Sequence, residues 1–306
     1  METLTQVGES WSGYTVLEAL GHLGIAERYR VRAPDGRLHL MDVVAMQHPN
    51  LLQRLQEADL QRIVHPNLLS VRDVVPVLRL PGVVCADSTG TSLERWRKAA
   101  PPLEQRLEVL RDVAAGLAAL HSEGTPHGLL QPGVVVVEDR GGPFARVGLP
   151  GVAAVVFALF REGGAISSSG ASLGGASFQS PEQQRNPGTV DPTTDLFALG
   201  CLAYWMFAGR SPFAGLDALA CYEAARSERY PPLVERFPDV PPRLIALIDE
   251  LLRANPVARP PAHDVVKRLD AMLPRRWVTV ARVWALMLAL VVASSAVGLL
   301  FAWFVS

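Results

Sequence analysis

The chain has 306 residues, a formal net charge of −1 and three cysteines. This length suits one large domain or two small ones, and the near-neutral charge argues against nucleic acid as a partner. Cys85, Cys201 and Cys221 are odd in number and lack metal-ligand spacing. We therefore expect free, buried thiols in a reducing compartment rather than a disulfide framework.

The first third of the chain has the pattern of a small antiparallel sheet. Residues 1–13 are polar and contain no apolar run typical of a signal peptide, so we expect an N-terminal tail. The predicted strands cover residues 14–20, 26–32, 38–44, 68–74 and 82–86. Apolar residues at helical spacing predict one helix, over residues 51–64.

The rest of the chain is expected to be mainly helical. The predicted helices cover residues 103–122, 193–208, 214–226, 242–253 and 262–273. A strand-rich first third followed by a helix-rich remainder predicts two lobes. The segment Leu149–Ser180 is rich in Gly, Ala and Ser, and it opens with the apolar run Val152–Phe160. The sequence gives no secure account of that run; packing into a cleft between the lobes is one option.

A 23-residue apolar run, residues 283–305, is a predicted transmembrane helix, because about 34 Å of helix crosses a bilayer. Five basic residues precede the run: Lys267, Arg268, Arg275, Arg276 and Arg282. Only Ser306 follows it, so the positive-inside rule predicts that the N-terminal side faces the cytoplasm. We expect a domain over residues 14–273, a basic juxtamembrane segment over 274–282 and a single-pass C-terminal anchor in the plasma (inner) membrane.

Three motifs in the second half of the chain carry a family resemblance. They are Ser180-Pro-Glu182, Asp195-Leu-Phe-Ala-Leu-Gly200 and Asn255-Pro-Val-Ala-Arg259-Pro260. With the motifs in this order and at this spacing, the chain resembles protein kinases over about residues 14–273. The sequences of the motifs are most similar to those of bacterial serine/threonine kinases.

The resemblance implies an α+β, bilobal protein-kinase-like fold. The N-lobe would be an antiparallel sheet plus one helix over residues 14–87, and the mainly helical C-lobe would cover residues 92–273. The resemblance also implies an ion pair between Glu182 and Arg259, and structural roles for Asp195 in a buried helix and His127 in the core.

The glycine-rich loop that covers phosphate in this family is degraded here. The family pattern G-x-G-x-x-G-x-V lets the backbone approach phosphate closely. In the matching stretch only Gly21 survives, because Leu23 and Ala26 replace the other two glycines. Arg28 stands where the resemblance implies a small apolar residue over the adenine.

Asp42 occupies the position of the phosphate-binding lysine, and strand alternation directs it and Leu40 into the cleft. The exchange replaces attraction for phosphate with repulsion. For unit charges about 5 Å apart at an effective dielectric of about 20, the interaction energy changes by about 6 kcal/mol. Because Arg28 and Asp42 carry opposite charges on facing strands, we hypothesise that they pair in the cleft and keep the lobes closed. Gln56, rather than Glu57, falls where the family has the lysine's glutamate partner.

The remaining catalytic positions are also replaced. Leu129 stands at the general base, Gln131 at the phosphate-contacting lysine, Val134 at the metal-binding asparagine and Leu149 at the metal-binding aspartate. A hard dication needs oxygen ligands, so neither a metal nor a nucleotide cofactor is expected. Glu138, beside a Gly-Gly turn, is expected to face solvent.

The sequence therefore predicts a catalytically inactive, membrane-anchored pseudokinase that acts as a signalling scaffold or allosteric partner. Its partners would be proteins, such as an active kinase or a phosphopeptide-binding protein. Ser294 and Gly298 have the spacing of a helix dimer, so a homodimer is one option. Ser167–Ser169 fit a linker better than a phosphorylation site. Two alternatives stay open: a serine/threonine kinase with an unusual catalytic set, and a small-ligand sensor that uses the remodelled cleft.

Overall fold

The computed structural model describes residues 7–162, 167–168 and 176–274 of the chain. The chain divides into two units, residues 1–270 and 271–306, and the helices and strands of the described residues belong to the first. The predicted transmembrane helix, with Ser294 and Gly298, lies outside the described residues, as does the juxtamembrane segment from residue 275 onward. Within the described ranges, no helix is long and apolar enough to span a bilayer.

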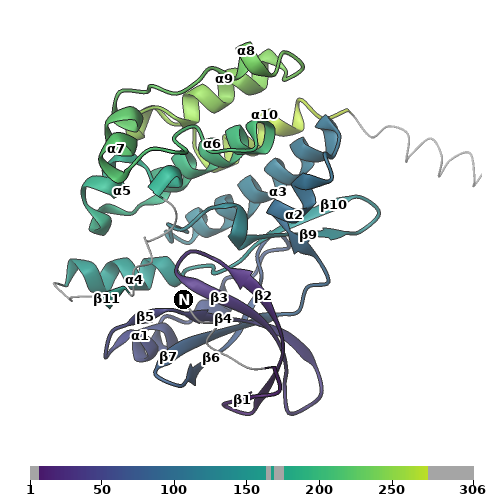
Figure 1. Cartoon of the computed structure of the whole chain (residues 1–306), viewed down its shortest axis with the longest axis vertical. Helices are drawn as coiled ribbons and strands as arrows, with labels where there is room; N and C mark the ends of the chain where they lie inside the picture. Colours follow the sequence, from purple (N-terminus) through teal and green to yellow (C-terminus); the bar gives the residue numbers. More distant parts are fainter. Residues whose placement is uncertain (1–6, 163–166, 169–175, 275–306) are drawn as a thin grey trace, which may run out of the picture. The chain divides into compact units, whose positions relative to one another are not determined.

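The N-lobe is a six-stranded antiparallel sheet with one short helix (Figure 1). Its strand order is β1-β2-β3-β4-β7-β6, with bounds Ser10–Trp11 (β1), Tyr14–His22 (β2), Ala26–Arg32 (β3), Leu38–Val44 (β4), Val71–Val77 (β6) and Leu80–Ala86 (β7). Tyr29, Met41 and Val84 belong to a buried apolar cluster that holds the sheet together. The predicted antiparallel sheet is therefore confirmed.

The predicted helix over residues 51–64 is too long. Helix α1 spans Leu51–Glu57, and the short 3₁₀ turn η1 follows at Leu60–Arg62. Asp59 between them has a left-handed backbone, with φ of 45°, which breaks the helical hydrogen-bond ladder. As a result Leu60 turns inward and is buried.

The segment before β6 is bonded to the C-lobe, which is why β6 begins at Val71 rather than at Leu68. The Leu69 amide donates to the Val147 carbonyl, and the Val147 amide donates to the Asn67 carbonyl, both at 2.9 Å. The Asn67 side-chain amide donates to the Ala145 carbonyl, also at 2.9 Å. These buried bonds fix the two lobes to each other at this point.

The C-lobe is mainly helical. Its helices are α2 Leu93–Lys98, α3 Leu103–Ser122, α4 Val152–Arg161, α5 Pro181–Arg185, α6 Pro192–Ala208, α7 Ala218–Arg226, α8 Leu233–Arg236, α9 Pro242–Leu251 and α10 Ala262–Asp270. A small sheet of order β10-β9-β8 lies beside α3, with β8 Thr91–Ser92, β9 Val135–Asp139 and β10 Pro143–Val147. Its 3₁₀ turns are η2 Pro132–Val134, η3 Ala176–Phe178, η4 Pro187–Thr189 and η5 Pro256–Ala258.

Helix α6 forms the centre of the C-lobe and is buried over most of its length. It begins at Asp191, whose carboxylate accepts hydrogen bonds from the amides of Thr193 and Thr194 at 2.7 and 3.3 Å. It ends at Gly209, whose φ of 74° suits a helix C-terminus.

The apolar run Val152–Phe160 forms helix α4. It contacts α1 and η4, and in Figure 1 it lies beside the ribbon made by β5 (Met46–Gln47) and β11 (Ser167–Ser168). None of its residues lines the cavity between the lobes. The run thus packs against α1 of the N-lobe, at a place separate from that cavity.

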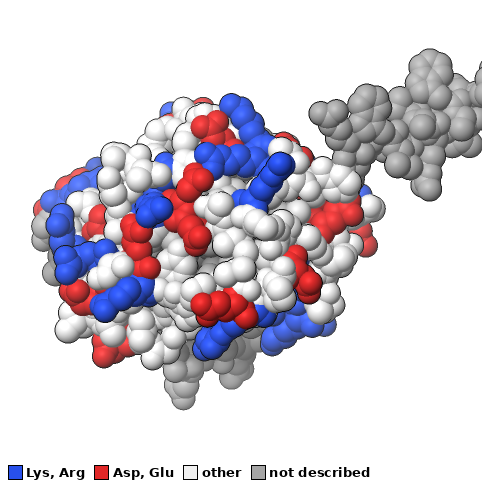
Figure 2. Space-filling view, turned by 90° about the horizontal axis from the view of Figure 1, so that it is seen from above, with Lys and Arg blue, Asp and Glu red and all other residues white. Residues whose placement is uncertain are grey.

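The charged surface agrees with the balanced composition. On the face seen in Figure 2, basic and acidic side chains are interspersed, so no continuous patch of one sign covers it.

The three cysteines are free and buried, as predicted.

Candidate functional site

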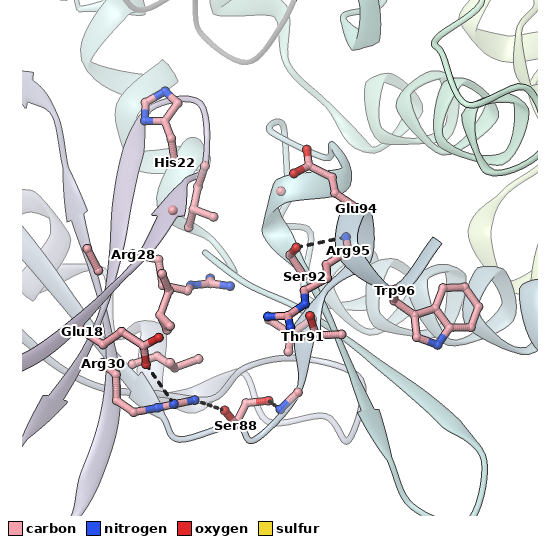
Figure 3. Close-up of a pocket in the computed structure, with 18 of the residues that line it drawn as sticks. Glu18, His22, Arg28, Arg30, Ser88, Thr91, Ser92, Glu94, Arg95 and Trp96 are labelled. Carbon is pink, nitrogen blue, oxygen red and sulfur yellow. Dashed lines mark hydrogen bonds and ion pairs between the residues drawn. The ribbon is translucent and has the colours of Figure 1, made fainter. Parts of the chain in front are cut away.

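A cavity of about 740 Å³ lies between the lobes (Figure 3). The N-lobe contributes residues 18–23 of β2 and the following loop, together with Arg28, Arg30 and Leu40. The linker contributes residues 88–92, and the C-lobe contributes Glu94, Arg95, Trp96, Ala99, Gly133 and Val136. The cleft expected from the sequence is therefore present, and its outer part is open.

The inner end of the cleft holds the pair formed by Arg28 and Asp42. These residues are direct cross-strand neighbours on β3 and β4. The Arg28 Nε lies 2.7 Å from Asp42 Oδ1, and Nη2 lies 2.8 Å from Oδ2, which is a bidentate contact. Arg28 is 4% exposed and Asp42 is fully buried. The pairing predicted from the sequence is confirmed.

This pair changes the electrostatics that the sequence alone predicted. Burial by itself lowers the pKa of Arg28, but Asp42 outweighs that effect and the net pKa is raised, so the guanidinium stays charged. The negative charge of Asp42 is thus balanced within 3 Å by the chain's own cation. The predicted swing of about 6 kcal/mol treats Asp42 as an isolated charge and is too large.

The guanidinium of Arg28 lies directly against Gly148. A Cβ at Gly148 would sit 2.3 Å from Arg28 Nη2, so only glycine leaves room for this arginine. Leu149, at the predicted metal-ligand position, follows in a left-handed conformation with φ of 55° and is fully buried. Its hydrocarbon side chain offers no ligand to a cation.

The loop between β2 and β3 rests on the C-lobe. The Gln131 side-chain amide donates to the Leu23 carbonyl at 2.9 Å, and Leu23 is 4% exposed. At Gly133 a Cβ would lie 3.1 Å from the His22 carbonyl oxygen, so the two segments are closely apposed. Gln131 of the C-lobe therefore holds the loop between β2 and β3 at Leu23.

Loss of this contact gives a direct test of the docked loop. Gln131→Ala should speed amide hydrogen exchange at Leu23 and Gly24, and should cost about 1 kcal/mol of stability, the usual net value of one neutral hydrogen bond. Exchange is measured by mass spectrometry on the full chain. Gln184→Ala is the control, since Gln184 makes a similar bond, to the Gln179 carbonyl at 2.8 Å, away from the cleft. Equal exchange in both variants would contradict a docked loop.

Leu129 and Val134, which the sequence comparison matched to the general base and a metal ligand, are both buried and apolar. The Val134 carbonyl accepts the Gly148 amide at 2.8 Å. Glu57 is exposed and accepts a bond from Gln53 at 2.8 Å, whereas the Gln56 side chain donates to the Val74 carbonyl at 2.9 Å. Neither Gln56 nor Glu57 is bonded to the buried pair.

The prediction that Glu138 faces solvent is wrong. Glu138 is 8% exposed, and it accepts bonds from Ser88, Arg140 and Arg146 at 2.7, 2.7 and 3.2 Å. Burial alone would raise its pKa, but these donors lower it. Arg30 completes the arrangement by donating to the Ser88 carbonyl at 3.0 Å. The sequence carries no signal for this network, because its members are brought together only by the fold.

His127 and Asp195 have the structural roles that the sequence predicts. The Asp195 carboxylate accepts hydrogen bonds from the amides of His127 and Gly128 at 2.7 and 2.6 Å. His127 Nε2 donates to the Gly148 carbonyl at 2.8 Å, since a carbonyl can only accept. Burial lowers the pKa of His127, which favours its neutral form.

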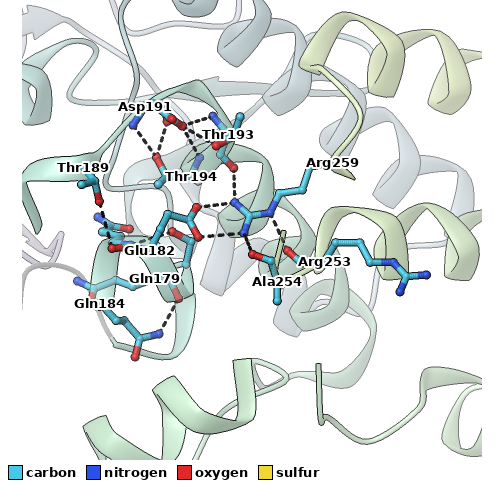
Figure 4. Close-up of polar contacts among 12 residues, drawn as sticks. Gln179, Glu182, Gln184, Thr189, Asp191, Thr193, Thr194, Arg253, Ala254 and Arg259 are labelled. Carbon is cyan, nitrogen blue, oxygen red and sulfur yellow. Dashed lines mark hydrogen bonds and ion pairs between the residues drawn. The ribbon is translucent and has the colours of Figure 1, made fainter. Parts of the chain in front are cut away.

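The predicted ion pair between Glu182 and Arg259 is also present (Figure 4). The two guanidinium nitrogens of Arg259 lie 2.6 and 3.0 Å from the carboxylate oxygens of Glu182. The same arginine donates to the carbonyls of Thr193 and Arg253 at 2.8 and 2.9 Å, and the Arg259 side chain is fully buried. The contact ties the segment before α6 to the segment before α10.

The fold, the cleft and these buried contacts define a protein-kinase-like domain. Residues 55–269 match the family model described as protein kinase domain, so the chain belongs to the protein kinase domain family.

Its relatives include two bacterial serine/threonine-protein kinases. The chain is 28% identical to PknB of Mycolicibacterium smegmatis over 258 residues, which are 79% of this chain and 40% of PknB. It is 31% identical to RqkA of Deinococcus radiodurans, described as a DNA damage-responsive serine/threonine-protein kinase, over 283 residues, 88% of this chain and 41% of RqkA. The chain thus spans about two fifths of either relative.

Solved structures show the same fold. The kinase domain of Mycobacterium tuberculosis PknI superposes with a TM-score of 0.64 at 21% identity, covering 87% of this chain and 99% of that one. A structure of Rad53 residues 1–466 with AMP-PNP superposes with a TM-score of 0.68 at 18% identity, covering 84% of this chain and 64% of that one. The bilobal protein kinase fold is therefore established.

Proposed function

We propose that this chain is a pseudokinase: a kinase-fold domain that does not transfer phosphate and acts by binding protein partners. The observation that carries the proposal is that the inner cleft is occupied by the chain's own contacts. The pair Arg28–Asp42 fills one part of it, and Leu23, held by Gln131, closes another.

The chemical requirements of phosphoryl transfer support this interpretation. The reaction needs a cation on the phosphates, oxygen ligands for magnesium and a carboxylate that orients the nucleophile. At the corresponding positions the chain has an internally balanced ion pair and the hydrocarbon side chains of Leu129, Val134 and Leu149. The competing hypothesis, a kinase with an unusual catalytic set, would need other residues to supply these three functions.

Nucleotide binding and phosphate transfer are tested together on the full chain. We expect no incorporation of label from radiolabelled ATP with magnesium or manganese, and no thermal shift with ATP. A ligand at about 100 times its Kd would stabilise the fold by about 2.7 kcal/mol, which corresponds to a shift of several degrees for a domain of this size.

An active bacterial serine/threonine kinase is the positive control. Incorporation that is lost when a single cleft residue is changed would overturn the proposal in favour of the unusual kinase. A shift with ATP but no incorporation would leave a nucleotide-binding pseudokinase, and would refute the expectation that no nucleotide cofactor binds.

A second candidate function, the small-ligand sensor, is favoured by one observation: the outer cleft is open, with a volume inside the range of about 300–1,000 Å³ common for ligand sites. Its walls combine the apolar side chains of Leu40 and Val136 with the guanidinium of Arg95. A thermal-shift screen with non-nucleotide metabolites separates this function from a purely scaffolding role.

We also propose that the domain works at the cytoplasmic face of the membrane, held by the predicted span over residues 283–305. The apolar length of that segment and the basic residues before it support this proposal. Partners would then be other membrane-associated proteins, including an active kinase or a second copy joined through Ser294 and Gly298. Alkaline extraction of membranes tests the anchor: release of the full chain into the soluble fraction would contradict it.

A further inference from the structure

Helix α4 is apolar on two faces, but the rest of the C-lobe covers only one of them. Val152, Val156 and Phe157 are buried against the rest of the C-lobe. Ala154 and Ala158, one turn apart on another face, are only partly buried. A surface helix normally carries polar residues on the face that its own fold does not cover. The second apolar face therefore needs an explanation of its own.

That face lines a second cavity, of about 340 Å³, between α1, η1 and α4; we call it the α1–α4 pocket. Ala154, Val155 and Ala158 form one wall, and the buried side chains of Leu60 and Ile63 form the opposite wall. One face of the apolar run Val152–Phe160 thus forms a wall of the α1–α4 pocket, which is separate from the 740 Å³ cavity.

The shape of the α1–α4 pocket is fixed by close contacts around it. The left-handed Asp59 turns Leu60 toward α4. Gly151, just before α4, has a left-handed φ of 76° that favours glycine, and a Cβ there would lie 2.8 Å from Leu60 Cδ2. Arg54 of α1 bonds Glu162 at the end of α4, with distances of 2.6 and 2.8 Å. The pocket is therefore built by both lobes.

Two charged side chains at the rim of the pocket, Glu57 and Arg62, have no ion-pair partner among the described residues. Arg54 is paired with Glu162, whereas Glu57 accepts a bond only from the neutral amide of Gln53. Arg62, which also lines the pocket, forms no side-chain hydrogen bond or ion pair within residues 7–162, 167–168 and 176–274. An apolar interior with a free guanidinium at its edge matches an amphiphilic anion, whose hydrocarbon part enters while its charge stays at the rim.

We propose that the α1–α4 pocket binds a small amphiphilic carboxylate, of the type represented by a medium-chain fatty acid. The volume favours a small molecule, because about 340 Å³ lies within the range of about 300–1,000 Å³ found for small-ligand sites. The proposal does not depend on whether the domain transfers phosphate.

The test uses a thiol reporter in the pocket wall. Ala158→Cys is made in the full chain, held in nanodiscs of phosphatidylcholine, and its reaction with a maleimide is timed with and without octanoate. The native thiols give little background, because Cys85, Cys201 and Cys221 are buried and burial raises the pKa of each. Ala154→Cys, one turn away on the same face, is a second reporter if the first variant folds poorly.

Octanoate at about ten times its Kd should slow the labelling about tenfold, since the rate follows the fraction of empty pocket. Octanol, which has a similar chain without the charge, should protect less. Arg62→Gln should weaken protection by octanoate about tenfold, the usual effect of losing one charge-assisted hydrogen bond, and leave protection by octanol unchanged. Arg229→Gln, an exposed arginine outside the pocket, is the matched control.

Three results would overturn the proposal. Octanoate fails to protect either reporter; octanol protects as well as octanoate; or Arg62→Gln behaves like Arg229→Gln. Nanodiscs of phosphatidylglycerol separate a soluble acid from a membrane lipid as the source. Protection in phosphatidylglycerol without octanoate would mean that an anionic lipid occupies the pocket, and would refute the small carboxylate.

Discussion

Asp42→Leu is expected to destabilise the domain by about 3–5 kcal/mol, because it leaves the buried guanidinium of Arg28 without a counter-charge. The cost should be this large because Arg28 is 4% exposed and its guanidinium is packed against Gly148, so water replaces little of the lost interaction with Asp42. The free energy of unfolding is measured by urea denaturation of the full chain in a mild detergent, followed by circular dichroism.

The double variant Arg28→Met with Asp42→Leu distinguishes a missing charge from a general packing defect. Replacing a whole buried pair by apolar side chains is often neutral or stabilising, so the double variant should recover most of the loss. Glu223→Ala is the control for an exposed ion pair, that with Arg226, and should cost no more than about 0.5 kcal/mol. A double variant as unstable as Asp42→Leu would contradict the charge argument.

Arg259→Met is expected to have a comparable effect, about 3–5 kcal/mol, because it leaves Glu182 without its partner. The substitution also removes the hydrogen bonds that Arg259 donates to the carbonyls of Thr193 and Arg253, at 2.8 and 2.9 Å. Glu182→Gln should cost less, about 1–3 kcal/mol, since the amide oxygen can still accept from Arg259. Both are measured by urea denaturation.

The informative result is which of the two variants loses more unfolding free energy. If Arg259 acts mainly as a hydrogen-bond donor to carbonyls, Arg259→Met will be clearly worse than Glu182→Gln. Equal losses would mean that the charge of Glu182 carries the contribution, and a loss under about 1 kcal/mol in Arg259→Met would refute a structural role for the pair.

The parts of the fold that the sequence predicted well are those with a strong local pattern. The strands over residues 26–32 and 38–44 and the helix over 103–122 have the predicted bounds. The same local register places Arg28 opposite Asp42, so their pairing was predictable from the two strands and the turn between them.

Other features depend on tertiary contacts that no local pattern encodes. The bond from Gln131 to Leu23 joins residues 108 positions apart, and the surroundings of Glu138 come from three separate segments. The end of α1 depends on a single left-handed residue, Asp59, which the helical pattern hides. Helix α4 was unassigned because an all-apolar run does not reveal which side is covered.

The anchoring of residues 67–69 to β10 has a mechanical consequence. At this end the lobes share three buried hydrogen bonds, whereas at the loop end the Gln131–Leu23 bond is one neutral contact. We therefore expect any widening of the cleft to be a rotation about the anchored end, with the largest displacement at the loop between β2 and β3. Releasing that loop breaks one neutral hydrogen bond, worth about 1 kcal/mol, and exposes Leu23, whose burial is worth about 1.5–3 kcal/mol.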